Sequence, residues 1–199
     1  MFNGIVYNIG KITNIKKNPR YVSGSSVIEV FSKIKFKKTD IGESVCCDGV
    51  CLTLIGIKKS GSFFFYLSKE TLKRSNFKYA KIGNIINIEK SLFHGKKISG
   101  HYTQGHVDTT SDVKKIKIID KSWFVDFVLA KKFMKYLMEK ASITVNGVSL
   151  TISKINKNGF QVAIIPHTLK LTNLSKLTKG SIVNIELDIF SKYLHKLKN

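Results

Sequence analysis

The chain has 199 residues, with 34 Lys or Arg against 13 Asp or Glu, and its formal net charge is +21. Hydrophobic residues make up 43% of the chain, which is enough for a buried core and excludes wholesale disorder. No apolar run reaches the length of a transmembrane helix and no signal peptide is evident, so we predict a cytoplasmic protein without a membrane partner.

The positive charge alone would suit a nucleic-acid-binding protein. However, the lysines are scattered in short groups, such as 16–17, 96–97 and 114–115. We interpret them as solvent-facing residues of strands and loops and expect no nucleic-acid partner. The three cysteines lie within residues 46–51, which argues against a disulfide framework. No Cys/His cluster completes a zinc site, so we expect no metal.

The first half of the chain is predicted to be β-structure. Asp48-Gly49 is a turn dipeptide between apolar runs and predicts a hairpin. Residues 63–67 form a short run rich in aromatic residues, which suits a buried strand, and residues 85–88 predict a closing strand.

The second half predicts a similar set of strands. Residues 142–145 and 150–155 alternate apolar and polar side chains on either side of the Asn146-Gly147 turn, and residues 182–185 predict another closing strand. Helix is scarce. Residues 131–140 are one candidate helix, and the tail 189–199 places Phe190, Tyr193, Leu194 and Leu197 on one helical face.

The two halves are copies of each other. DGVCLT at 48–53 returns as NGVSLT at 146–151, and ETL at 70–72 returns as HTL at 167–169. GNIINIE at 83–89 returns as GSIVNIE at 180–186, and GIV at 4–6 as GHV at 105–107. The order is kept at a nearly constant offset of roughly 100 residues, which is too long for a solenoid unit and indicates a duplicated domain. We place the two domains at 1–97 and 98–188, followed by the tail 189–199.

These segments carry a resemblance to riboflavin synthases. The opening MFNGIV, the KETL at 69–72 and the SGH and QGHVD segments within 99–108 also match the family, over about residues 1–188. The resemblance implies an all-β chain of two tandem homologous six-stranded Greek-key barrels with a short C-terminal helix. It implies that each barrel binds one 6,7-dimethyl-8-ribityllumazine, without a metal or organic cofactor, and that the chain works as a homotrimer.

The implied reaction is a dismutation, in which one lumazine donates a four-carbon unit to a second and yields riboflavin and 5-amino-6-ribitylamino-uracil, the last step of riboflavin biosynthesis. Donor and acceptor are the same molecule, which fits two related sites. The sequence leaves open which barrel holds the donor and whether lumazine synthase associates with the chain.

Carried over residue by residue, the resemblance implies a set of site residues. The catalytic candidates are Cys51, His106, Ser149 and Ser44. The substrate-binding candidates are Phe2, Gly4, Ile5, Val6, Cys51, Leu52, Thr53, Tyr66, Leu67, Ser68, Lys69, Glu70, Thr71, Gly105, His106, Val107, Lys140, Asn146, Ser149, Leu150, Thr151, Ile165, Pro166, His167, Thr168 and Asp188.

Residue chemistry ranks some of these candidates. His106 is the strongest acid/base candidate because its ordinary pKa lies near neutrality, whereas His101 is expected to be structural. Cys51 and Ser149 occupy equivalent positions, so their difference predicts unequal roles for the two barrels. His167 departs from the glutamate that is usual in the family.

Several alternatives stay open. Asp188 could equally cap a helix in the tail. Ser44 could be an ordinary solvent-facing serine, and the base for the 7-methyl proton is not assigned. The second candidate function is a lumazine- or flavin-binding antenna protein of the same fold that has no catalytic activity.

Overall fold

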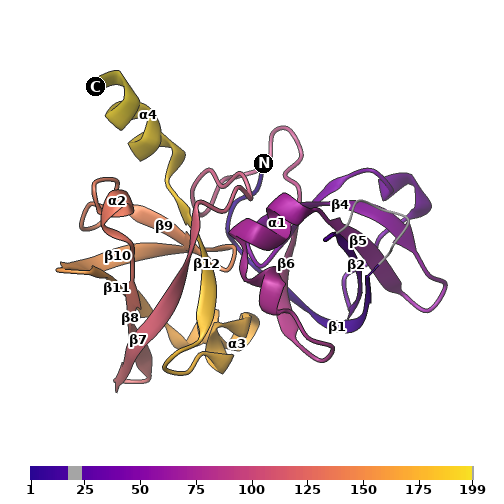
Figure 1. Cartoon of the computed structure of the whole chain (residues 1–199), viewed down its shortest axis with the longest axis horizontal. Helices are drawn as coiled ribbons and strands as arrows, with labels where there is room; N and C mark the ends of the chain where they lie inside the picture. Colours follow the sequence, from indigo (N-terminus) through magenta and orange to yellow (C-terminus); the bar gives the residue numbers. More distant parts are fainter. Residues whose placement is uncertain (18–23, 199) are drawn as a thin grey trace.

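The computed structural model of the chain describes residues 1–17 and 24–198. They form two closed antiparallel barrels of six strands each, side by side along the long axis (Figure 1). The predicted fold class is thereby confirmed.

The first barrel closes in the order β1-β2-β5-β4-β3-β6, so strands distant in the chain become neighbours, as in a Greek key. Its elements are β1 (Asn8–Lys17), β2 (Ser26–Ser32), η1 (Lys38–Asp40), β3 (Ser44–Cys47), β4 (Val50–Ile57), β5 (Ser62–Leu67), α1 (Lys69–Arg74), η2 (Asn76–Tyr79) and β6 (Ile85–Lys90).

The second barrel repeats this cyclic order as β7-β8-β11-β10-β9-β12. Its elements are β7 (Thr109–Ile119), β8 (Ser122–Val128), α2 (Lys131–Met134), β9 (Ser142–Val145), β10 (Val148–Asn156), β11 (Gly159–Ile164), α3 (Pro166–Leu171), η3 (Asn173–Lys176) and β12 (Ile182–Leu187). The tail helix α4 (Ile189–Lys198) follows and projects from this barrel (Figure 1).

Alternation along the strands builds each core. In β4, Leu52 and Leu54 point inward and are buried, whereas Thr53 between them is exposed. β10 repeats the pattern with Leu150 and Ile152. One face of each strand therefore fills the barrel, and the other is free to carry polar groups toward solvent or a ligand.

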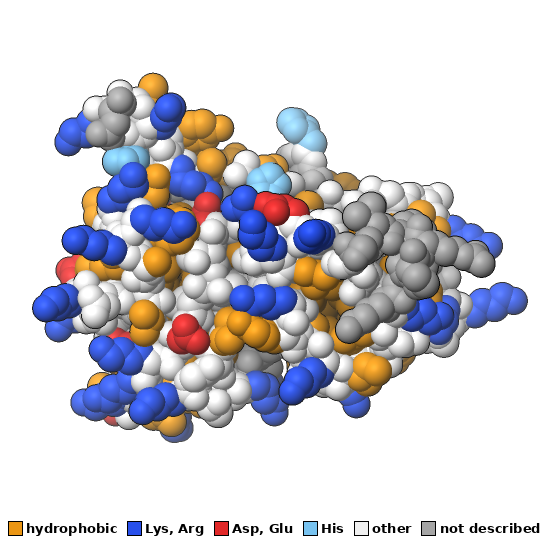
Figure 2. Space-filling model, viewed as in Figure 1, with side chains coloured by type: hydrophobic (Ala, Val, Ile, Leu, Met, Phe, Trp, Pro, Cys, Tyr) orange, Lys and Arg blue, Asp and Glu red, His pale blue; other side chains and the backbone are white. Residues whose placement is uncertain are grey.

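Exposed lysines occur on both barrels. Figure 2 shows them on one face of the molecule, separated by apolar and uncharged side chains.

The two hairpin turns predicted from sequence meet where the barrels touch. Asp48 and Asn146 both have φ 45°, and Gly49 and Gly147 have φ 81° and 77°, so both turns need left-handed residues. A methyl group on Gly49 would lie 2.8 Å from the Gly147 nitrogen. The repeat has thus placed two copies of one turn back to back.

Buried amide side chains join the barrels around these turns. Asn87 donates through Nδ2 to the Asn146 carbonyl at 2.9 Å, and its repeat copy Asn184 donates in the same way to the Asp48 carbonyl at 2.8 Å. The Asp48 carboxylate accepts from the Asn87 nitrogen at 2.7 Å, and the Asn146 amide oxygen accepts from the Asn184 nitrogen at 2.8 Å. The interface is therefore polar, satisfied and nearly symmetric.

The helix expected over 131–140 is wrong in length. Only α2, Lys131–Met134, is helical, and no side chain caps its start at Ala130. Short turns follow, in which the Tyr136 and Leu137 nitrogens donate to carbonyls three residues earlier. The left-handed Lys140, at φ 70°, then directs the chain toward β9. The apolar stripe at 133–137 packs on the second core and needs no full helix to do so.

Candidate functional site

Two short segments cross between the barrels before their own strands begin. Phe2 and Thr103 form an antiparallel bridge, with N–H···O distances of 2.8 and 3.2 Å. Beyond it, Val6 packs into the core of the second barrel, and Val107 packs against the core of the first. We call residues 2–6 and 103–107 the crossing segments. The predicted boundary at 97/98 separates the strand sets, but these segments each serve the opposite barrel.

Each crossing segment is hydrogen-bonded to a candidate site residue of the opposite barrel. The Ser149 nitrogen donates to the Gly4 carbonyl at 2.8 Å, and the Cys51 nitrogen donates to the Gly105 carbonyl at the same distance. The two predicted residues that differ most between the halves are therefore held in one geometry, each by a turn from the other half.

The fit at these contacts requires glycine. Gly4 and Gly105 have φ 71° and 75°, a region that L-residues rarely adopt. A methyl group would lie 2.7 Å from the Cβ of Ser149 in one case and of Cys51 in the other. The crossing segments therefore rest directly on the strands that carry the candidate residues.

Two glutamates at the ends of the closing strands hold the crossing turns. Glu89 accepts from the nitrogens of Asn3 and Gly4, and Glu186 accepts from those of Gln104 and Gly105. Burial raises the pKa of each carboxyl to about 7, although the backbone donors oppose that shift. Sequence reasoning missed both residues, although their repetition in NIINIE and IVNIE was a visible signal.

The first barrel gathers its candidates on β3, β4 and the start of α1. Ser44 is directly opposite Thr53, and Cys51 opposite Cys46, in the β3–β4 pair. At the end of β5, Ser68 caps α1 by accepting from the Thr71 nitrogen at 3.0 Å. Half-buried Cys51 and Ser44 and exposed Thr53 thus lie on one accessible sheet surface.

The second barrel places its copies in the same way. Ser149 lies opposite Thr144 and Thr151 opposite Ser142 in the β9–β10 pair. At the end of β11, Ile165 precedes α3, and Pro166 occupies its first turn. No side chain caps α3, and proline suits its first turn because the N–H that it lacks would have no partner within the helix.

His101, which the sequence analysis expects to be structural, lies against two hydroxyl groups of the second barrel. Its Nδ1 lies 2.7 Å from Ser149 Oγ, and its Nε2 lies 3.2 Å from Thr144 Oγ1. Burial lowers the pKa of the imidazole, while nearby Asp188 opposes the shift. A neutral ring donates through one nitrogen and accepts through the other, so His101 connects the two hydroxyls. Its signal is weak in the sequence because none of the repeated segments contains it.

His106, the acid/base candidate from sequence, lies in the crossing segment beside Gly105 and is exposed. It precedes β7 rather than forming part of it. Its side chain is open to solvent.

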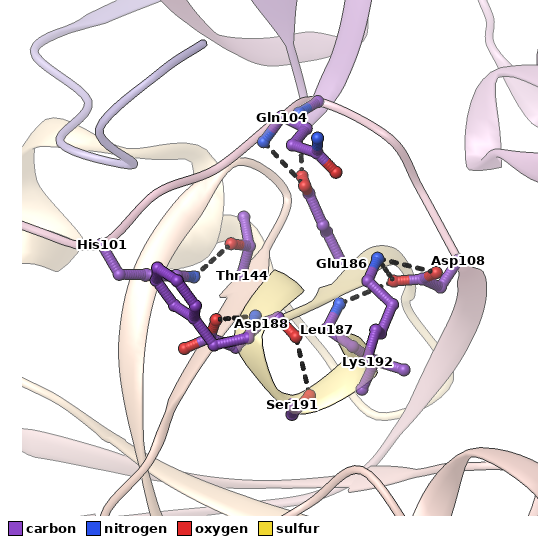
Figure 3. A network of polar contacts seen from close by, with 11 residues as sticks. His101, Gln104, Asp108, Thr144, Glu186, Leu187, Asp188, Ser191 and Lys192 are labelled. Carbon is purple, nitrogen blue, oxygen red and sulfur yellow. Dashed lines mark hydrogen bonds and ion pairs between the residues drawn. The ribbon is translucent and has the colours of Figure 1, made fainter. Parts of the chain in front are cut away.

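Figure 3 shows how the second site connects to the tail helix. Asp188 accepts from the Phe190 nitrogen at 2.9 Å and so caps α4, as the second reading of that residue predicted. Asp108 accepts from the Leu187 nitrogen at 2.8 Å and from Lys192 Nζ at 2.9 Å. The start of α4 is thereby fixed to the second barrel beside His101.

Several predicted residues lie in the supporting structure rather than on the surface. The side chains of Phe2, Val6, Leu52, Leu67 and Leu150 are buried in the fold. Asn146 belongs to the amide network between the barrels. The remaining candidates lie as follows: Ile5, Tyr66 and Thr168 half-buried, Val107 against the first core, and Lys69, Glu70, Lys140 and His167 exposed.

Among residues 1–17 and 24–198, no group of three or more His, Cys, Asp or Glu side chains could hold a metal ion. In the same part of the chain, no helix combines the length and apolar character that crossing a membrane would require.

Comparison with known proteins agrees with the duplicated geometry. The family model for the lumazine binding domain matches residues 3–91 and again residues 104–188. Riboflavin synthase from Actinobacillus pleuropneumoniae is 34% identical over 98% of this chain and 89% of its own length. The chain belongs to the riboflavin synthase family. It is accordingly an enzyme of the riboflavin synthase class.

Other riboflavin synthases agree. The protein from Buchnera aphidicola is 36% identical over 98% of this chain and 92% of its own length. The riboflavin synthase from Mycobacterium tuberculosis (strain ATCC 25618 / H37Rv) is 32% identical over 99% of this chain and 98% of its own length.

Solved structures share the fold at lower identity. LumP complexed with riboflavin superimposes with a TM-score of 0.82 at 24% identity, covering 94% of this chain and 99% of LumP. LumP complexed with 6,7-dimethyl-8-(1'-D-ribityl) lumazine superimposes with a TM-score of 0.79 at 23% identity, and the same shares of both chains are covered. At this identity the likeness concerns the fold alone.

Proposed function

We propose that the chain converts two molecules of 6,7-dimethyl-8-ribityllumazine into riboflavin and 5-amino-6-ribitylamino-uracil. One lumazine gives up a four-carbon unit, and the other accepts it and becomes riboflavin. The single observation that carries this proposal is the repeated contact of a crossing segment with Cys51 in one barrel and Ser149 in the other. A reaction between two identical molecules suits two equivalent binding sites in one chain.

The protein's main contribution is alignment of the two rings. The 7-methyl group of the lumazine is acidic for a C–H bond because its anion is delocalised into the ring. Holding two reactants in place can supply roughly 7–11 kcal/mol of a bimolecular barrier. Thr53 and Thr151 would contact the substrates, as would residues of the segments 66–71 and 165–168 other than the exposed His167.

The proton transfers fall to the polar groups beside these residues. In the second barrel, Ser149 is the hydroxyl that His101 polarises, over 2.7 Å. In the first barrel, Cys51, Ser44 and the imidazole of His106 are the available groups. The two sites therefore differ in their proton chemistry, which matches the different fates of donor and acceptor.

We further propose a cytoplasmic homotrimer in which α4 packs against other subunits. Phe190, Tyr193, Leu194 and Leu197 are exposed on α4, and Leu197 is 84% accessible. A helix of ten residues is marginal on its own, so an apolar face of this size is best stabilised by contact with another surface.

The test of the reaction is direct. Purified protein is incubated with 6,7-dimethyl-8-ribityllumazine, and riboflavin is followed by its absorbance. We expect riboflavin to form at half the rate at which lumazine disappears, with no added metal or cofactor. Saturable binding without turnover would reject the enzyme in favour of an antenna protein of this fold. The presence of the Gly-Val-x-Leu-Thr and Thr-Leu segments in both halves favours the enzyme.

Sedimentation tests the assembly. At micromolar concentration we expect a trimer, and Leu194→Asp in the exposed face of α4 should dissociate it. A wild-type protein that is monomeric and fully active would contradict the trimer. Adding lumazine synthase in the same experiment would reveal an association between the two enzymes.

A further inference from the structure

Half-buried Glu89 and buried Glu186 make the same pair of contacts, one in each half of the chain. Glu89 accepts a hydrogen bond from the Asn3 nitrogen through Oε1, at 2.8 Å, and one from the Gly4 nitrogen through Oε2, at 3.0 Å. Glu186 takes the Gln104 nitrogen at 2.7 Å and the Gly105 nitrogen at 2.9 Å (Figure 3). Each carboxylate thus uses both oxygens to fix one crossing turn.

Beyond the turn, the contact passes to the opposite barrel. Glu89 stands on β6 of the first barrel, but its turn is bonded to Ser149 of the second. Glu186 stands on β12 of the second barrel, but its turn is bonded to Cys51 of the first. The route from each glutamate to the opposite site is two hydrogen bonds long.

The turns have little room to adjust without moving the site. The Cβ of Ser149 and that of Cys51 lie within 2.7 Å of where a methyl group on Gly4 or Gly105 would be. A turn that shifts by a few tenths of an ångström must therefore move the strand residue beneath it.

We propose that Glu89 and Glu186 are positioning residues with crossed targets. Glu89 shapes the lumazine site of the second barrel, and Glu186 shapes that of the first. The proposal rests on the proposed function, since it assumes one lumazine site on each barrel. It makes each site dependent on a side chain that belongs to the other barrel.

The chemistry requires a carboxylate rather than an amide. A carboxylate presents two acceptor oxygens to the two N–H groups, whereas glutamine presents one oxygen and one NH₂ group. Glu→Gln keeps the size of the side chain but faces one backbone N–H with another donor. It therefore releases half of the turn's anchoring with the smallest change of shape.

The experiment separates the two sites before testing the glutamates. Thr53→Trp fills the surface of the first site, and Thr151→Trp fills that of the second, so each background retains one lumazine site. Lumazine is titrated into each background by fluorescence, with and without Glu89→Gln or Glu186→Gln. Glu139→Gln is the matched control, because Glu139 also accepts a backbone N–H, from Ile155 at 3.0 Å, away from both crossing segments.

Each glutamate variant is expected to weaken binding in one background only, and the two variants in opposite backgrounds. Glu89→Gln should weaken lumazine binding at least tenfold in the Thr53→Trp background and leave the Thr151→Trp background unchanged. Glu186→Gln should do the reverse, and Glu139→Gln should affect neither. Equal losses in both backgrounds, or losses confined to the glutamate's own barrel, would overturn the proposal.

Two further measurements keep the outcome decisive. If Glu89→Gln does not fold, Asn3→Ala replaces it, because the Asn3 side chain holds the same turn by accepting from the Ser99 and Gly100 nitrogens at 2.9 and 2.7 Å. It should weaken the second site alone, and an equal effect on both sites would count against the proposal. Absence of lumazine binding by the unaltered protein would reject the proposed function instead.

Discussion

The two barrels share a frame and differ in the groups placed on it. Strand order, hairpin turns, glutamate contacts and crossing glycines repeat from one half to the other. Cys51 faces one crossing turn and Ser149 the other, and His101 contacts the hydroxyls of Ser149 and Thr144 in the second barrel. Duplication has preserved the backbone geometry at the crossing turns, while the polar side chains beside them have diverged. The proposed dismutation suits this combination, since it would bind one molecule twice but treat the two copies differently.

The largest expected effect tests the shared frame. Gly4→Ala and Gly105→Ala should each lower the free energy of unfolding by about 3 kcal/mol or more, from left-handed strain plus a close contact. Their losses should be alike, because both glycines meet the same environment.

Gly83→Ala is the control for the strain of placing an alanine in left-handed backbone. Gly83 has φ 98° but nothing within 4 Å of a new methyl group, so about 1 kcal/mol is expected. Denaturant titration measures all three variants. A loss at Gly4 or Gly105 no larger than at Gly83 would show that the crossing segments do not press on the barrels.

The next effect tests the difference between the barrels. Ser149→Ala should lower kcat about 100-fold, the lower end for loss of acid/base assistance, whereas Cys51→Ala should cost less than about tenfold. Steady-state riboflavin formation measures both variants. Equal losses would argue that the barrels play the same role.

His101→Gln should lower kcat by about as much as Ser149→Ala does, and by more than Cys51→Ala does. Because the two side chains act as one unit over 2.7 Å, the double variant should be no slower than either single one. Multiplicative losses in kcat would show that His101 and Ser149 act independently.

A smaller effect concerns Asp48, a carboxyl within the buried amide network between the barrels. Burial raises the pKa of Asp48 from 3.8 to about 7, whereas its repeat copy is the neutral Asn146. Between these pH values the folded chain binds more protons than the unfolded chain. The stability that this group contributes is therefore complete below pH 3.8 and is lost as the pH rises through about 7.

Asp48→Asn removes this pH dependence while keeping an oxygen for the Asn87 and Asn173 donors. We expect the stability of the variant relative to the wild type to rise between pH 5 and pH 8 by about 2 to 3 kcal/mol, because each pKa unit corresponds to about 1.4 kcal/mol. Urea unfolding at both pH values measures the gap. A gap that narrows as the pH rises would contradict the assignment.

The smallest effect is expected at the clearest departure from the family pattern. His167 stands where the first half has Glu70, and both side chains are exposed. His167→Glu should therefore leave the thermal midpoint unchanged and alter lumazine affinity less than threefold. A larger change in fluorescence titration would show that this position contacts the substrate.

Sequence alone predicted the strands and turns well, because their signals are local. Alternation and the two turn dipeptides are enough to define β4, β10 and their hairpins. The length of α2 was missed, since its apolar stripe fits a series of turns as well as a helix. The candidate site residues came from resemblance, and their ligand contacts stay predictions.

The crossing of residues 2–6 and 103–107 could not be predicted, because its partners lie far along the chain. Nothing within a few residues of Gly4 reveals that Ser149 will donate to it. The roles of Glu89 and Glu186 depend on that crossing. Only their repetition at the end of an apolar strand indicated that these two acids were set apart from the others.

The crossing also sets an order for events on the ribosome. Residues 2–6 are translated roughly 10 to 30 seconds before their partner Ser149 at ordinary rates of synthesis. The strands of the first barrel, residues 8–90, can close in the meantime. Residues 2–6 therefore reach their final place only when the second barrel forms, and Phe2, which is buried in the finished fold, should be exposed on the nascent chain until then.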